Sequence, residues 1–571
     1  MVNQPKNHKS GFRSIHLETF GCQMNELDSE LVRGHLAALG YRFTPDPEEA
    51  DIILYNTCSV REQAENKVLS RIGIIGAKKR EAEAAGLPAR RVVLGVIGCM
   101  AEREGPAMMR RFPQIDLMCG PGELDKLPML LENVLTTHHA LDAHDDAHAS
   151  RAGFLQPGSR SHAKHNTIEG RIALQGSNAR RSSTLAAAED SLELLDLSRA
   201  FDPDYATSQN RSAYVRITRG CNKFCTYCVV PHTRGPEVHR PPDAIIDECK
   251  RLADAGIIEV TLLGQTVNHY TYTHGLALTV DGREAPQVGP GLSAFRRNGA
   301  EPASQTTSFA DLLHRIHEEV PAIQRLRFVT SYPRDFGDDI LHVMAASPRI
   351  CRYLHVPAQS GSNRILKLMN RGYTVEQYME FINRALAILP DVSIAGDIIV
   401  GFPTETDEDF EMTKNLLRRV PFKNNFIFKY SPRPGTTAID RFPDDVPDEV
   451  KRRRNNELLA LQSEISAKVH EAWIGRTLDV FVERISSKAE AREAREAPRE
   501  TASSRTVSLT VAGRAGVRER SASGVQLSGR TGGDLIVVFD LPHGRSADDL
   551  IGSIVPVRIT SAGPLILRGE L

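Results

Sequence analysis

The stretch Cys221-Asn-Lys-Phe-Cys225-Thr-Tyr-Cys228 decides how the middle of the chain is interpreted. It places three thiols within eight residues, directly after the apolar run AYVRITRG at 213–220. Thiolates are the usual ligands of iron–sulfur clusters, and three of them can ligate three irons of a [4Fe–4S] cube while the fourth iron stays open for a small molecule. The alternatives are a zinc site and chance. Zinc prefers four ligands, whereas no matching second cysteine pair follows nearby in the sequence.

Around this motif the sequence alternates short apolar runs with helical patterns. The candidate strands are 213–220, 259–265, 326–333, 353–361, 392–403 and 425–432. Helical patterns such as PDAIIDECKRLADAG lie between most of them, so we expect a partial (β/α)6 barrel with parallel strands. Active sites of such barrels lie at the carboxyl ends of the strands, where the cysteine motif stands. The run 273–307, rich in Gly, Pro and Arg, interrupts the pattern and is interpreted as a surface insertion.

The N-terminal part has an α/β pattern of its own. SIHLETF at 14–20, DIILYNT at 51–57 and RVVLGVIG at 91–98 are apolar runs that precede helical patterns, and IDLMCG at 115–120 is a fourth candidate strand. Short apolar runs that alternate with helices are typical of βαβ units. We therefore expect an open parallel α/β sheet.

Three cysteines share one position in this sheet. Cys22, Cys58 and Cys99 each follow an apolar run and precede a helix. The carboxyl ends of parallel strands meet at one edge, where helix N-termini favour an anionic group, so we expect these thiols to hold a second cluster. The alternative is that they are small buried hydrophobic residues. Cys119 also follows a strand, which weakens the pattern slightly.

The rest of the chain divides into further segments. We expect an N-terminal domain at 12–135, a linker at 136–206, a central domain at 207–469 and a small all-β barrel at 472–571, interrupted by an insertion at about 486–525. The barrel strands are TLDVFVERI, LIVVFD, SIVPVRIT and LILRGEL. A His- and Asp-containing run at 138–148 is interpreted as solvated linker rather than a metal site.

Composition excludes several classes of protein. The chain is 41% hydrophobic and 25% charged with a net charge of −1, which is ordinary for a soluble globular protein. It has no run of about eighteen apolar residues for a membrane span, and its basic N-terminus has no apolar stretch of the kind that a secretory signal needs. Nine cysteines in 571 residues are too sparse for a disulfide scaffold. We therefore expect a cytoplasmic protein whose clustered thiols bind metal.

The central cysteine motif resembles that of the radical-SAM superfamily, with Tyr227 as the aromatic residue before the last cysteine, and the resemblance implies that Tyr227 contacts the cofactor. The resemblance implies that S-adenosylmethionine binds the open iron and is cleaved to a 5′-deoxyadenosyl radical. It also implies that Gly264 and Gln265, after the second strand, bind the methionine amino group. By the same resemblance, Gly401 in GDIIVGFPTET lies near the adenine.

Longer motifs are similar to those of the MiaB family of methylthiotransferases. They are TFGCQMNELDSE, NTCSVREQAENKV, GCMAER, ITRGCNKFCTYCVVPHTRGPE, LLGQTVN, LHVPAQSGSNRILKLMNRGYT, DIIVGFPTETDEDF and FKYSPRPGT. The tail, with LSGRT at 527–531, resembles the RNA-binding TRAM domain, so its deletion from Gly475 is expected to weaken tRNA binding without stopping cleavage of S-adenosylmethionine. GCQMN at 21–25 separates the chain from two related branches. At the same position, the sequence of the ribosomal-protein S12 modifiers resembles GCPKN and that of the threonylcarbamoyladenosine modifiers resembles GCKVN.

The family resemblance implies an activity: methylthiolation at C2 of N6-isopentenyladenosine at position 37 of tRNA, with S-adenosylmethionine as both methyl donor and radical source. The implied ligands of two [4Fe–4S] clusters are Cys22, Cys58 and Cys99 for an auxiliary cluster and Cys221, Cys225 and Cys228 for the radical-SAM cluster. The implied partner is the tRNA anticodon loop, with Arg334, Arg433 and the tail strands as candidate RNA contacts. The sequence identifies neither the electron donor nor the sulfur donor. The rival classes are a radical-SAM enzyme that acts on a protein and a non-catalytic iron–sulfur protein.

Overall fold

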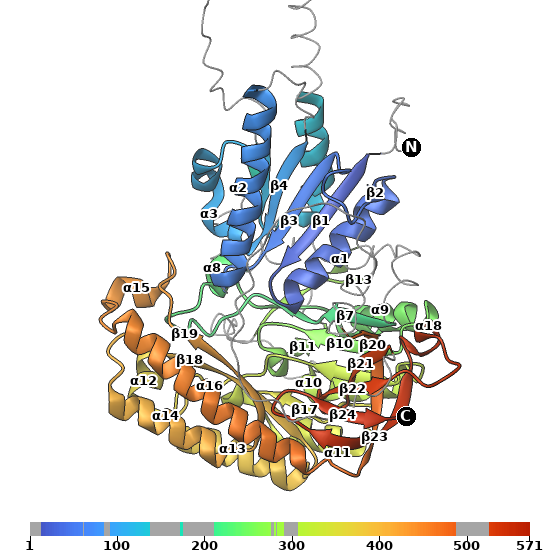
Figure 1. The fold of residues 1–571 in the computed structure, drawn as a ribbon, viewed down its shortest axis with the longest axis vertical. Helices are drawn as coiled ribbons and strands as arrows, with labels where there is room; N and C mark the ends of the chain where they lie inside the picture. Colours follow the sequence, from blue (N-terminus) through green and yellow to red (C-terminus); the bar gives the residue numbers. More distant parts are fainter. Residues whose placement is uncertain are drawn as a thin grey trace, which may run out of the picture.

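The computed structural model describes residues 13–60, 62–84, 92–137, 172–174, 211–275, 279–280, 283–289, 306–486 and 525–571. The chain forms an N-terminal sheet with its helices, a central run of parallel strands and helices, and a small C-terminal barrel (Figure 1). Most of the predicted linker at 136–206 and of the insertion at 486–525, and the run 138–148, lie outside the described residues. In the described ranges no helix combines the length and the apolar character that a membrane span requires.

The N-terminal sheet has six parallel strands in the order β2-β1-β3-β4-β5-β6. Their bounds are β1 Ser14–Phe20, β2 Arg42–Phe43, β3 Ile52–Thr57, β4 Val93–Gly98, β5 Leu117–Cys119 and β6 Ile172–Leu174. The four predicted strands are present, as is the parallel arrangement. Strand β6 differs from the prediction, because it falls inside the segment interpreted as linker. It has only three residues, too few for a recognisable alternation, and its pairing with β5 is a tertiary contact.

Helices cover both faces of this sheet. They are α1 Gln23–Ala38, α2 Glu62–Ala84 and α3 Cys99–Arg111. On one face Leu27 of α1 shares an apolar core with Leu54 of β3. On the other, Val68 of α2 shares a core with Ile53. Successive strand residues point to opposite faces, so a sheet covered on both faces needs the continuous apolar strands that the sequence shows.

The central unit contains two three-stranded parallel sheets, one formed by β7, β10 and β16 and the other by β17, β18 and β19. The strands are β7 Ser212–Arg216, β10 Glu259–Leu263, β16 Arg325–Phe328, β17 Tyr353–His355, β18 Ser393–Val400 and β19 Phe422–Lys429. Each coincides with a predicted strand. A parallel bridge between Leu326 and Ile350 and a hydrogen bond from the Ser331 amide to the His355 carbonyl, at 3.0 Å, link the two sheets.

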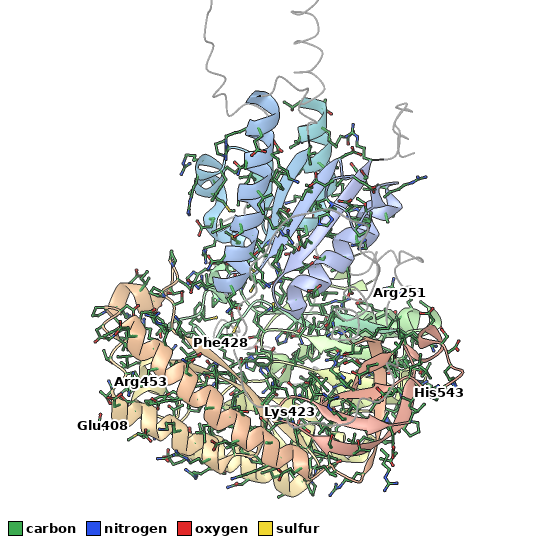
Figure 2. The ribbon with its side chains drawn as sticks, viewed as in Figure 1. Arg251, Glu408, Lys423, Phe428, Arg453 and His543 are labelled. Atoms are coloured by element: carbon green, nitrogen blue, oxygen red, sulfur yellow. The ribbon has the colours of Figure 1, made fainter. Side chains whose placement is uncertain are left out.

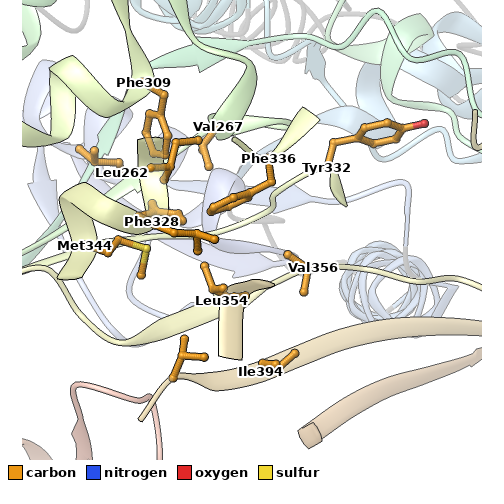
Figure 3. Packing of buried hydrophobic residues seen from close by; sticks show 14 of the residues in the cluster. Leu262, Val267, Phe309, Phe328, Tyr332, Phe336, Met344, Leu354, Val356 and Ile394 are labelled. Atoms are coloured by element: carbon orange, nitrogen blue, oxygen red, sulfur yellow. The ribbon is translucent and has the colours of Figure 1, made fainter. Parts of the chain in front are cut away.

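Helices pack on the outer side of these strands. They are α9 Pro242–Asp254, α10 Phe309–Glu319, α11 Asp338–Ala346, α12 Asn363–Leu368, α13 Val375–Ile388, α14 Asp407–Arg419 and α16 Asp448–Glu471. Figure 3 shows part of the core. The rings of Phe309 and Phe328 meet edge to face with their centroids 5.1 Å apart, and Phe336 packs beside Phe328. Because this core lies between strands and helices, the carboxyl ends of the strands remain available for a functional site.

Part of the predicted insertion at 273–307 contacts the core. Strand β14 Gln287–Val288 pairs with β9 Val238–His239, which itself pairs with β8 Thr218–Arg219 beside the cysteine motif. The Gln287 side chain also accepts a hydrogen bond from the Thr273 amide at 2.9 Å. The insertion is therefore anchored next to the cysteine motif.

The C-terminal strands close into a barrel in the order β20-β21-β22-β24-β23. The strands are β20 Thr477–Ile485, β21 Gln526–Thr531, β22 Ile536–Asp540, β23 Ile554–Ala562 and β24 Leu567–Glu570. The four strands predicted for the tail are present, and the LSGRT motif lies in β21. The chain's only tryptophan, Trp473, packs against the apolar core of this barrel.

Buried cations join the barrel to the central unit. Arg325 donates to the carbonyl of Arg530 at 2.7 Å, and Arg327 donates to Glu259 at 2.8 Å and to the carbonyl of Thr531. Lys423, labelled in Figure 2, donates to the Asp534 carboxylate at 2.6 Å. These cations stand at the amino ends of β16 and β19. The barrel is therefore docked on the end of the strands opposite the cysteine motif.

Candidate active site

Three strands bring the first thiol triplet together. Phe20, Thr57 and Gly98 are neighbours in the parallel register of β1, β3 and β4. Cys58 and Cys99 come next in the chain, Cys22 follows two residues after Phe20, and the Cys58 amide donates to the Phe20 carbonyl at 3.0 Å. The predicted convergence at the carboxyl edge is therefore present in the structure.

The protonation of these three thiols is mutually dependent. A hydrogen bond with Cys58 is the main cause that lowers the pKa of Cys22 to about 6, against the opposing effect of burial. The same hydrogen bond raises the pKa of Cys58 well above its usual value, and burial raises the pKa of Cys99. Cys22 thus carries the thiolate most readily, and a bound metal would have to stabilise the other two as thiolates.

Cys119 occupies a different environment although it lies near the same edge. It is inside β5, paired with Ile97 on one side and Leu174 on the other, and is fully buried in the apolar core. Its thiol donates to the carbonyl of Glu123 at 3.2 Å. Burial raises the pKa of Cys119 well above its ordinary value. These features favour a structural role for this thiol.

The second triplet stands on the loop that follows β8. The Cys221 amide donates to the Gly235 carbonyl at 3.2 Å and the Cys228 amide to the Cys225 carbonyl at 3.0 Å, which folds the loop back on itself. Phe224 has a φ of 49°, an uncommon conformation for a residue with a side chain, and is 58% exposed. Burial raises the pKa of Cys221 to about 12 and also raises the pKa of Cys228.

Tyr227 is half-buried. It packs against the apolar group that contains Phe402 and Tyr430, and burial raises the pKa of its hydroxyl well above the usual value. The structure therefore gives Tyr227 a packing role beside the cysteines, and its predicted role toward a cofactor stays a prediction.

Polar atoms without partners gather at the carboxyl ends of the central strands. Within the described residues, five buried side-chain oxygens there lack a hydrogen-bond partner; they belong to Thr218, Gln265, Thr266, Ser331 and Gln359. These residues follow β7, β10, β16 and β17. Buried polar groups are normally satisfied, so orphans grouped at strand ends indicate a place where a polar ligand binds. Gln265 lies where the sequence places a contact to a methionine amino group.

Two glycines of the predicted cofactor site are required by packing. A Cβ on Gly264 would stand 2.1 Å from the Thr218 hydroxyl, and one on Gly401 would stand 2.3 Å from a side-chain carbon of Lys451. Gly401 also has a φ of 68°, and its amide donates to Glu405 at 2.9 Å. The backbone can therefore approach closely at both places, while their contacts to a cofactor remain predictions.

Buried ion pairs hold the two thiol triplets in one assembly. Arg234 from the central unit pairs with Asp28 of α1 at 2.7 Å, with both side chains buried. Arg433 pairs with Glu65 of α2 at 2.6 Å. Arg433 is only 8% exposed, so the prediction that it contacts RNA is wrong: a surface position was inferred from charge alone. Arg334 is half-exposed and pairs with Asp335.

The sequence interpretation gave no role to Arg234 or Arg371. Arg371 is buried and donates to the Cys225 sulfur at 3.4 Å. Both arginines lie within motifs that resemble the methylthiotransferases. The motif of Arg234 also carries three cysteines, which was an available signal, whereas the motif of Arg371 contains no cysteine.

The donor sets fit iron–sulfur clusters better than a single ion. Among the described residues, no three His, Cys, Asp or Glu side chains form a compact site for one metal ion. Two all-thiol triplets, each with a buried arginine nearby, instead suit bulky anionic clusters, for which thiolates are the usual ligands.

Comparisons with known proteins show which family the chain resembles. A model described as "Radical SAM superfamily" matches residues 215–417, and one described as "Uncharacterized protein family UPF0004" matches residues 14–120. The tRNA-2-methylthio-N(6)-dimethylallyladenosine synthase of Rhodopirellula baltica is 38% identical over 563 residues, which is 96% of this chain and 97% of that protein. The protein of the same name from Opitutus terrae is 35% identical and covers 98% of this chain and 97% of its own. The solved structure of the radical S-adenosylmethionine methyltransferase TsrM from Kitasatospora setae, with cobalamin and a [4Fe–4S] cluster, is 14% identical, covers 75% of this chain and 77% of that one, and has a TM-score of 0.43.

Proposed function

Because the chain belongs to the family of tRNA-2-methylthio-N(6)-dimethylallyladenosine synthases, we propose that its two thiol triplets serve one methylthiolation reaction. The protein is a radical-SAM transferase that methylthiolates isopentenyladenosine in tRNA, and its cofactors are S-adenosylmethionine and [4Fe–4S] clusters. The observation that carries the assignment of residues is the presence of two all-cysteine triplets at the carboxyl ends of two sets of strands, joined across the interface by buried ion pairs.

Each triplet has its own cluster in this proposal. The auxiliary cluster would be held by Cys22, Cys58 and Cys99, and the radical-SAM cluster by Cys221, Cys225 and Cys228. When bound, the clusters and S-adenosylmethionine supply the electron, the radical that removes hydrogen from C2 of the adenine, and the methylthio group that replaces it. Acid–base catalysis by side chains cannot substitute for this chemistry, because an aromatic C–H of this kind has no useful acidity.

The chain's own residues bind and orient the small molecule. The orphaned oxygen of Gln265 is an acceptor suited to an ammonium group, and the nearby hydroxyls of Thr266 and Ser331 can donate to a carboxylate or a ribose. Gly264 and Gly401 let the backbone pack directly against the side chains of Thr218 and Lys451, which fixes the loops that carry the proposed cofactor contacts. Burial of these groups excludes water, which protects a reactive radical from side reactions.

The finer features of the proposal concern the RNA and the domains. We place the target at position 37 in the anticodon loop, and we assign RNA binding to the C-terminal barrel as a TRAM-like domain. The six central strands, linked through the Leu326–Ile350 bridge, fit a partial (β/α)6 barrel. The domain bounds follow as 12–135, 207–469 and 472–571, and the proposed location is the cytoplasm.

Mass spectrometry of tRNA nucleosides from a strain that lacks this gene tests the proposal. We expect the methylthiolated nucleoside to disappear and isopentenyladenosine to accumulate. Plasmid-borne wild-type protein and Cys119→Ser should restore the modification, whereas Cys22→Ala and Cys225→Ala should not. Unchanged nucleosides in the deletion strain, together with loss of a modification from a ribosomal protein, would contradict the assignment to tRNA.

A further inference from the structure

Each thiol triplet has one buried arginine beside it, supplied by a part of the chain that carries none of the three cysteines. Arg234 accompanies the N-terminal triplet and Arg371 the central one, and both are 6% exposed. A buried guanidinium is costly unless it is paired, so its position next to a group of thiols calls for an explanation.

Arg234 lies at the interface of the two units. It follows the short helix α8 Val230–Thr233, and its Nη2 donates to Oδ2 of Asp28 at 2.7 Å. Its positive charge lowers the pKa of Cys22 and opposes the rise in the pKa of Cys99 that burial causes. One guanidinium thus pairs with a carboxylate of α1 and acts through its charge on two of the three thiols.

Arg371 has a different set of partners. Its Nη1 lies 3.4 Å from the sulfur of Cys225, its Nη2 donates to the carbonyl of Pro357 at 3.1 Å, and its Nε donates to the hydroxyl of Tyr373 at 2.9 Å. It also stands 4.7 Å from the centre of the Tyr332 ring. The oxygens that hold Arg371 are neutral, whereas the charge of Arg234 is offset by Asp28.

We propose that Arg234 and Arg371 are positioning residues that each set the reduction potential of one cluster, Arg234 for the auxiliary cluster and Arg371 for the radical-SAM cluster. This inference rests on the proposed function, since it requires the two triplets to hold clusters. Reduction potentials of iron–sulfur clusters depend on net charge and on hydrogen bonds to the sulfurs, and both act strongly where water is excluded. A cation that donates to a ligand sulfur favours the more negative, reduced state. The effect of Arg371 should exceed that of Arg234, because Arg371 donates directly to a ligand sulfur, whereas the Nη2 of Arg234 donates to Asp28.

The test is a potentiometric titration of the reconstituted full chain, followed by electron paramagnetic resonance. Each cluster is measured alone, in a chain whose other triplet is replaced by Ala. Arg371→Gln should shift the oxidised-to-reduced ratio of the radical-SAM cluster at least tenfold toward the oxidised form, which is a potential about 59 mV lower for one electron. Arg234→Gln should lower the potential of the auxiliary cluster by less. Arg371→Gln should leave the potential of the auxiliary cluster unchanged, and Arg234→Gln should leave the potential of the radical-SAM cluster unchanged.

Asp28→Asn separates the charge effect from a merely structural one. It removes the carboxylate that offsets Arg234, so the auxiliary potential should rise, whereas in Arg234→Gln it falls. Arg371→Lys should recover part of the loss seen in Arg371→Gln. Potentials that do not move, that move in both clusters together, or that fall in both Asp28→Asn and Arg234→Gln would overturn the inference. Failure of the wild-type chain to bind iron at both triplets would instead refute the proposed function.

Discussion

Arg327→Met should loosen the docking of the C-terminal barrel on the central unit. Arg327 is 4% exposed and donates to the buried carboxylate of Glu259 at 2.8 Å and to the carbonyl of Thr531 in the barrel. Methionine fills most of the volume of the arginine stem. It leaves the Glu259 carboxylate with the Ser212 hydroxyl at 3.2 Å and with two more distant cations, Arg325 and Arg530, each at 4.0 Å. Removing one partner of a buried pair costs about 3–5 kcal/mol, because the other charge stays buried.

Tryptophan fluorescence in urea measures this loss. Trp473 is the only tryptophan of the chain and packs against the barrel core, so its emission reports on the barrel and its junction with α16. Small units lose about 1–3 kcal/mol of stability per molar urea. A loss of about 3 kcal/mol should therefore lower the urea midpoint of the Trp473 transition by roughly 1–3 M.

The double variant Arg327→Met/Glu259→Met is the matched control. It replaces both charges of the pair by apolar groups, a change that is often neutral or stabilising. It should therefore recover most of the midpoint and retain only a loss of about 1 kcal/mol from the missing hydrogen bond to the Thr531 carbonyl, which still accepts from the Asp534 amide at 3.0 Å. The reasoning fails if Arg327→Met unfolds at the wild-type urea concentration, or if the double variant is no more stable than the single one.

The remaining predictions concern the clusters and the substrate. Reconstituted wild-type protein should hold about eight irons, and Cys225→Ala about four with loss of S-adenosylmethionine cleavage; iron near eight in that variant would show that the ligand assignment is wrong. Cys119→Ser should keep its iron and its activity, since the Cys119 thiol donates to the Glu123 carbonyl and its backbone pairs with β4, and loss of half the iron would refute that view. The isopentenyl group buries carbons at about 0.8 kcal/mol each, or roughly 3–4 kcal/mol in all, so tRNA from cells without the isopentenyl-transferring enzyme should react a few hundredfold more slowly. Equal rates on the two tRNAs would exclude an isopentenyl pocket.

Most of the fold could be predicted from the sequence because its strands are apolar on both faces and alternate with helices. All six central strands and four strands of the N-terminal sheet are where the apolar runs lie. Strand β6 could not be predicted in the same way. Its three residues carry no pattern, and they become a strand only because β5 offers an unpaired edge.

The cysteines of the site could be predicted for a related reason. Parallel strands bring their carboxyl ends to one edge, so position in the pattern implied proximity for Cys22, Cys58 and Cys99. The arginines could not be placed, because a cation in a loop has the same sequence signature whether it is exposed or buried. Arg433 was expected at the RNA and is buried against Glu65, while Arg371 had no expected role and contacts Cys225.

The position of the barrel changes what truncation of the tail would mean. The resemblance to a TRAM domain predicts that deletion from Gly475 weakens tRNA binding without stopping cleavage of S-adenosylmethionine. Arg325, Arg327 and Lys423 would lose barrel partners in such a chain. Arg327 would keep Glu259, whereas Arg325 and Lys423 would remain as poorly paired cations at the end of the core. A truncated protein with low activity would therefore not distinguish loss of RNA binding from damage to the core, which makes Arg327→Met the better perturbation.

That perturbation also tests how the barrel contributes to the reaction. Glu259 begins β10 on the barrel side and Gln265 follows its other end, so a strand of five residues, about 16 Å long, separates the docked barrel from the polar site. The barrel should therefore hold a part of the tRNA other than the target base, and the rigid junction should set the spacing between the two contacts. An isolated anticodon stem-loop lacks the part of the tRNA that the barrel holds, so the wild-type protein should methylthiolate it more slowly than full-length tRNA. Arg327→Met should slow the reaction of full-length tRNA and should change the rate with the stem-loop little. If both substrates lose activity equally, the junction acts through the stability of the core and not through the placement of the RNA.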